Sequence, residues 1–171
     1  MATGFLRRKK LTNDEIVGRS SAFIYGNVLI LAALVALSPQ DVEEGHAVAV
    51  ILGTGISTLV AHLFAESHAH RIRHGKKLTR EEWRIEFRNA VPIMSATAWP
   101  SFVIFLGMMD VLSVLESWFV AVGIIIARMI AQGFVIARFE DRKPTFKDFL
   151  GGLALAGIAL AVALLKAELT H

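Results

Sequence analysis

Two side chains that could bind or carry a cation lie close together in the second of five apolar stretches of this chain. His62 and Glu66 are four residues apart, so a helix places both on one face, with His70 one turn further on. Imidazole and carboxylate are ligands for divalent transition metals, and either group can also take up a proton. Because a carboxylate inside a membrane is costly, we predict a proton or tentative metal site at His62 and Glu66.

The histidines that follow Glu66 belong to a segment rich in Arg and Lys. His68, His70 and His74 are interpreted mainly as interfacial side chains at the lipid headgroups, although His68 and His70 could extend the site.

Three further polar side chains lie deep in apolar stretches. Arg128 is nearly ten residues from the basic end of its stretch, about 13–15 Å by the rise of a helix. An arginine at that depth needs a carboxylate, carbonyl groups or water, and Glu66 is one candidate partner. Gln132 shares the face of Arg128, and Asn27 either bonds to another helix or lines a polar path. A packing salt bridge and a role in transport both remain open for Arg128.

The elements that must position these residues are membrane spans. The chain has 171 residues, of which 54% are hydrophobic and 19% charged, and the charges are concentrated between long apolar runs. This pattern predicts an all-α polytopic membrane protein, a single transmembrane domain with five spans at about 20–37, 46–67, 87–108, 115–137 and 149–165. We expect N-terminal caps at Thr12, Thr79 and Thr145, with the helix that begins near Arg80 continuing into the third span.

Two spans carry residues that indicate close packing. The third span contains Pro92 and Pro100, which predict a kinked or locally unwound helix packed inside the bundle. The fifth span contains the small-residue pairs Gly152/Ala156 and Ala159/Ala163, which favour close helix contact. That small-residue face is expected to be either internal or a contact between chains.

The loop charges predict the orientation and location. Lys and Arg are concentrated in the N-terminal segment, which includes Arg7–Lys10, and in loops 68–86 and 138–147, whereas the other two loops are acidic or neutral. The positive-inside rule then places the N-terminus in the cytoplasm and the C-terminus outside, in what we expect to be a bacterial plasma membrane. Because the basic residues lie in topogenic loops, they do not indicate nucleic-acid binding.

Several chemistries have no signal in this sequence. The chain has no cysteine, which excludes disulfides, thiolate metal sites and thiol nucleophiles. It has no G-x-S-x-G, H-E-x-x-H or Walker motif. We therefore expect a protein that is not an enzyme and has no resident cofactor, with a divalent metal ion only as a transported substrate.

A few residues resemble those of known membrane families. Phe23-Ile24-Tyr25-Gly26-Asn27 and the spacing from His62 to Glu66 are similar to the first and second helices of the vacuolar iron transporter family, in which a methionine precedes the glutamate. The chain departs from that family because Asn27 stands near the place of its aspartate, and one basic loop replaces its glutamate-rich metal-binding helices. The chain also resembles small five-span membrane proteins of the actinobacterial type, whose role is unknown. The first resemblance implies a dimer with its pathway between subunits.

Two functions of different classes follow. The leading hypothesis is a transporter- or channel-like protein that moves a cation, either a divalent metal or a proton, along Asn27, His62, Glu66, Arg128 and Gln132. The alternative is a non-transporting scaffold or accessory subunit held by the small-residue face of the fifth span. In both cases we expect the lipid bilayer and further copies of the chain, as a homodimer or higher oligomer, to be its partners.

Overall fold

The protein folds as a set of long α-helices. The computed structural model describes residues 12–139 and 142–170, and all regular secondary structure in these ranges is helical. The helices are α1 (Asn13–Val35), α2 (Pro39–Glu43), α3 (His46–His74), α4 (Arg80–Met108), α5 (Val114–Phe139) and α6 (Phe146–Thr170). All except α2 are long and apolar enough to cross a membrane, which confirms the predicted all-α architecture with five spans.

Local capping explains where the helices begin. Thr12 and Thr79 each form a capping box with a glutamate three residues later, and Thr145 pairs in the same way with Asp148. These starts were predicted from the sequence. The helix that begins at Arg80 also continues into the third span, as expected.

Two features extend beyond the predicted spans. The acidic segment after the first span was expected to be a loop, but Pro39–Glu43 forms a short helix because Ser38 caps it and Pro39 occupies its first turn. Helix α3 continues to His74, about two turns past the predicted end, and stops at Gly75 with a left-handed φ of 68°. The basic run after Glu66 is therefore largely helical.

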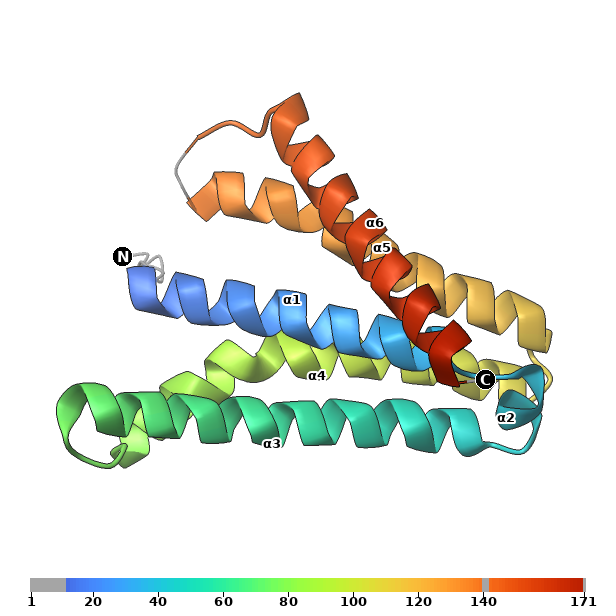
Figure 1. Cartoon of the computed structure of the whole chain (residues 1–171), viewed down its shortest axis with the longest axis horizontal. Helices are drawn as coiled ribbons and strands as arrows, with labels where there is room; N and C mark the ends of the chain where they lie inside the picture. The colour runs from blue at the N-terminus through green and yellow to red at the C-terminus, as the bar shows by residue number, and fades with distance from the viewer. Residues whose placement is uncertain (1–11, 140–141, 171) are drawn as a thin grey trace, which may run out of the picture.

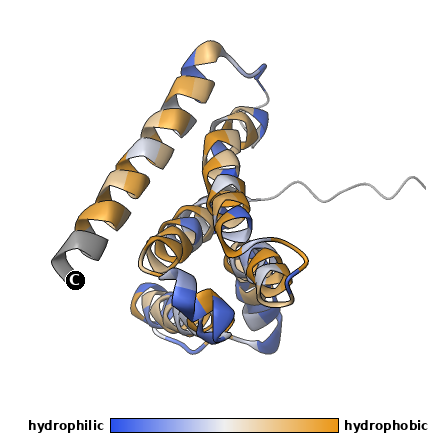
Figure 2. Ribbon diagram, turned by 90° about the vertical axis from the view of Figure 1, so that its right-hand side faces the viewer, coloured by the Kyte–Doolittle hydropathy of each residue, from blue (hydrophilic) through white to orange (hydrophobic). Residues whose placement is uncertain are grey.

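Helix α1 lies at the centre of the arrangement. It contacts α3, α4, α5 and α6, whereas α6 contacts only α1 and α5 among the helices described. Figure 1 shows α6 crossing obliquely over α5 and α1, and Figure 2 shows it at the edge of the bundle. The starts of α1 and α4 and the ends of α3 and α5 lie at one end, here called the basic end.

Helix α4 is the most buried span. In the most apolar 18-residue stretch of α4, 44% of the residues are buried, against 22–28% in the corresponding stretches of the other four spans. Helix α4 therefore packs inside the bundle, as predicted. The helix is continuous through Pro92 and Pro100, so it is not unwound, but it is bent in Figure 1. Its prolines are accommodated within a packed helix rather than in a break.

Small residues bring pairs of helices into close contact. The predicted packing face of α6, formed by Gly152, Ala156, Ala159 and Ala163, is buried within this chain. A Cβ at Gly152 would overlap the carbonyl of Ile130 on α5, so the two backbones touch there. The structure therefore places this face inside the chain.

Candidate functional site

A polar cavity opens at the basic end between α1, α3 and α4. Its volume is about 380 Å³. It is called here the basic-end cavity, and its main polar lining residues are Asp14, Glu15, Glu66, His70, Arg73, His74, Glu86 and Asn89. Glu66 is therefore reached from this cavity, and it shares the lining with residues from two other helices.

Glu66 has a weak partner on its own helix. Its Oε2 lies 3.6 Å from Nη2 of Arg73, two turns along α3, and the Glu66 side chain is 30% exposed. Glu86 on α4 also lines the cavity and forms no salt bridge with the described residues. Two carboxylates from different helices thus face one polar space, where a proton or a cation is electrostatically favoured.

Two histidines that were interpreted as interfacial line the same cavity. The rings of His70 and His74 lie 4.5 Å apart, and Nε2 of His70 is 3.7 Å from Oε1 of Glu82. His68 instead stacks on Phe64 and is exposed. Two imidazoles therefore lie beside carboxylates in the same polar space.

His62 lies one turn deeper than Glu66. Its Nε2 is buried and has no hydrogen-bond partner among the described residues. It is not part of the cavity lining, but it is about 6 Å further along α3 from Glu66 by helix rise. The predicted pair therefore consists of one residue in the cavity and one directly beneath it.

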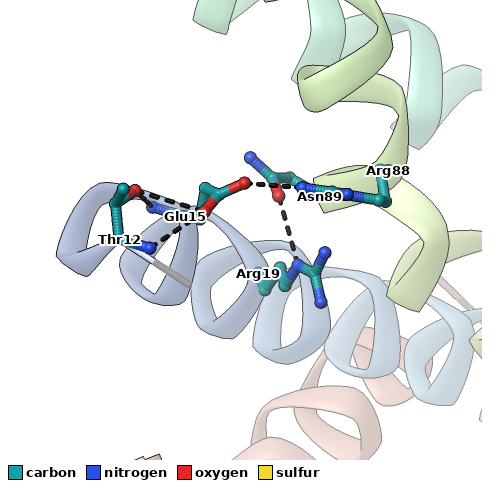
Figure 3. Close-up of polar contacts among 5 residues, drawn as sticks. All are labelled: Thr12, Glu15, Arg19, Arg88 and Asn89. Atoms are coloured by element: carbon teal, nitrogen blue, oxygen red, sulfur yellow. Dashed lines mark hydrogen bonds and ion pairs between the residues drawn. The ribbon is translucent and has the colours of Figure 1, made fainter. Parts of the chain in front are cut away.

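Polar contacts fasten α1 to α4 at the edge of the cavity (Figure 3). Oε1 of Glu15 lies 2.6 Å from Nη2 of Arg88, while Oε2 of Glu15 accepts from the backbone of Thr12. One turn deeper, Nε of Arg19 donates to Oδ1 of Asn89 at 3.2 Å. These contacts fix the spacing of the two helices that form one wall of the cavity.

Arg128 occupies a second polar site, deeper in the bundle. Its Nε donates to Oδ1 of Asn27 at 3.0 Å, and its Nη2 donates to Oγ of Ser95 at 2.9 Å and to the carbonyl of Pro92 at 3.4 Å. The guanidinium carbon also lies 5.1 Å from the ring centre of Phe23. The site therefore joins α1, α4 and α5 through neutral groups.

The structure does not bring Glu66 and Arg128 together. Glu66 is in the basic-end cavity with Arg73, and Arg128 binds Asn27 and Ser95. Between the two sites lies an apolar layer, defined by the buried residues Ala22, Leu63, Ala90 and Ile93. A salt bridge between Glu66 and Arg128 is therefore not formed, and the two residues belong to separate polar sites with apolar packing between them.

Gln132 belongs to neither of these sites. It is 3% exposed and lines a smaller cavity of about 290 Å³ between α1, α5 and α6, together with Lys147 and Asp148. The predicted path residues are thus distributed over three places in the bundle, and the hydrogen bond among these five described residues joins Asn27 and Arg128.

No metal centre is assembled in the part of the chain that the structure describes. No group of three or more His, Asp or Glu side chains there is placed to hold a metal ion. The carboxylates and histidines of the basic-end cavity face shared space without converging on one point.

The spacing of polar residues in the sequence also indicates the residues that line the cavity. Glu82, Glu86 and Asn89 recur at the four- and three-residue spacing of one helix face, as do Glu66, His70 and Arg73. What the spacing does not show is that these two faces meet.

Comparisons of the chain with protein-family models, with curated proteins and with solved structures gave no match. The resemblance to vacuolar iron transporters therefore stays a prediction, and function has to be argued from the two polar sites.

Proposed function

We propose that this protein is a small membrane transporter that takes up a proton at Glu66 in the basic-end cavity. The observation that carries the proposal is that a polar cavity of about 380 Å³ reaches Glu66, which has only a 3.6 Å contact with Arg73. A carboxylate kept only to lock helices together would be dry and fully paired.

The deeper part of the proposed path starts at His62. Its buried, unpaired Nε2 is about one turn from Glu66 and is able to accept a proton from that side. Beyond it, the apolar layer of Ala22, Leu63, Ala90 and Ile93 closes the way to Arg128. Movement of the proton past this apolar layer therefore requires a rearrangement of the helices.

Helix α4 is the element that such a rearrangement would use. It carries Glu86 and Asn89 in the cavity, Ile93 in the apolar layer and Ser95 at the Arg128 site. Pro92 lies between these positions and removes one backbone hydrogen bond, which makes bending there easier. A change in the α4 bend would couple the two polar sites.

A proton suits this site better than a divalent metal. A proton needs a single carboxylate or imidazole, whereas a metal needs several converging ligands, and the described residues do not gather three.

The scaffold alternative has less support. It placed the partner contact on the small-residue face of the fifth span, and this face is occupied by α5 and α1 of the same chain.

Flux into proteoliposomes that contain a pH-sensitive dye tests the proposal. The protein is reconstituted, an inward pH gradient is imposed, and valinomycin with potassium compensates the charge. Acidification faster than in empty liposomes is expected. A rate equal to that of empty liposomes, with the protein folded and monodisperse, would favour the scaffold.

A further inference from the structure

Arg128 carries a charge in the middle of its span that no described residue balances. It is 14 residues after the start of α5 and 11 before its end, so about 21 Å and 17 Å from the two ends by helix rise. Its partners are an amide, a hydroxyl, a carbonyl and an aromatic ring, none of which carries negative charge.

The guanidinium also has N–H donors that form no hydrogen bond with the described residues. Its Nε and Nη2 are engaged with Asn27, Ser95 and Pro92, whereas Nη1 donates to none of the described residues. Arg128 and Ser95 are both partly exposed, so the group is not sealed by packing. A guanidinium in this condition attracts an anion strongly because the surrounding dielectric is low.

The planar guanidinium favours one class of anion. Nη1 keeps its two N–H groups for an oxygen atom of a small anion, and a monovalent ion balances the single charge. We propose that Arg128 binds a small monovalent oxyanion, such as nitrate or a short carboxylate, between α1, α4 and α5. This deepens the proposed function, on which it rests for a role in transport, because an anion held at Arg128 would move together with the proton.

The neighbour of Arg128 offers a specific test. Oδ1 of Asn27 already lies 3.0 Å from Nε of Arg128, so Asn27→Asp places a carboxylate on the guanidinium with almost no change of shape. The substitution supplies the missing negative charge from within the chain, and it also removes the Nδ2 donor that bonds the carbonyl of Phe23 at 2.6 Å. The new carboxylate should remove the need for an external anion, whatever the net change in stability.

Binding is measured by thermal unfolding in phosphatidylcholine nanodiscs, with sodium nitrate replacing sodium gluconate at constant ionic strength. A ligand that binds only the folded state raises Tm as its concentration increases. We expect nitrate to raise Tm in the wild type and in Arg138→Gln, an exposed control at the basic end. We expect no rise in Asn27→Asp, where Tm with nitrate is compared with the Tm of the same variant in gluconate.

The Tm measurement tests the anion site independently of the proton-flux assay. An equal nitrate effect in Asn27→Asp and the wild type would show that the anion binds elsewhere and overturn the proposal. No nitrate effect in the wild type would overturn it as well. If the Tm effects appear as expected but the liposomes show no proton flux, the anion site stands and the transport proposal fails.

Discussion

Oδ1 of Asn27 accepts a hydrogen bond from Nε of Arg128 at 3.0 Å, and this contact joins α1 to α5 in the middle of the bundle. Asn27 is fully buried, and its amide also donates to the carbonyl of Phe23 at 2.6 Å. Together with Ser95 on α4, the two side chains form a polar connection between three helices.

Asn27→Ala should destabilise the protein because it leaves Nε of Arg128 without this acceptor. Interhelical hydrogen bonds in membranes are worth about 0.6–2 kcal/mol, and we expect a loss in this range. Unfolding in mixed micelles, followed by circular dichroism, measures it. Tyr25→Phe, at a position that is 49% exposed, serves as the control on the same helix. Equal stability of the two variants would contradict the role of the Asn27–Arg128 contact.

Gly152→Ala should loosen the packing of α6 on α5. The added Cβ would overlap the carbonyl of Ile130, and overpacking of this kind costs about 1–3 kcal/mol. The neighbouring Gly151 has open space around it, so Gly151→Ala is a matched control that should be neutral or slightly stabilising. Thermal unfolding of the two variants in the same detergent makes the comparison. If Gly151→Ala is the more harmful of the two, the described α5–α6 contact is wrong.

The sequence was sufficient for the architecture because the relevant signals are local. Long apolar stretches define the five spans, and Thr12, Thr79 and Thr145 mark three helix starts through contacts within one turn. The short helix Pro39–Glu43 was missed although Ser38 and Asp41 form the same kind of cap, because the segment was interpreted by its charge alone.

The candidate site was harder to predict because it depends on which helix faces meet. His62 and Glu66 were found from their spacing, but Glu86 and Asn89 lie on another helix and enter the cavity only through the packing of α4 on α1 and α3. For the same reason Arg128 was considered as a partner of Glu66, whereas its actual partner is Asn27.

The ion pair between Glu15 and Arg88 should contribute modestly to stability. The atoms are 2.6 Å apart, but the Arg88 side chain is 57% exposed, and pairs of this kind are worth about 0.2–1 kcal/mol. A double-mutant cycle with Glu15→Gln and Arg88→Gln measures the coupling by unfolding in micelles. Salt should reduce the coupling because exposed charges are screened. A coupling of zero at low salt would mean that this contact does not hold α1 on α4.

The predicted orientation can be tested with single cysteines because the natural chain has none. Lys76→Cys lies in the α3–α4 loop at the basic end, and Glu43→Cys lies on α2 at the opposite end. In intact cells a membrane-impermeant maleimide should label Glu43→Cys and not Lys76→Cys. The reverse labelling pattern would place the basic-end cavity outside the cytoplasm.

The central claim is that Glu66 takes up the transported proton, and the most direct measurement is the proton flux of Glu66→Gln beside that of Glu43→Gln. Both substitutions remove one carboxylate, but Glu43 is exposed on α2, far from the cavity. We predict that flux falls to the level of empty liposomes in Glu66→Gln and stays at the wild-type level in Glu43→Gln. Wild-type flux in a folded Glu66→Gln would contradict the claim.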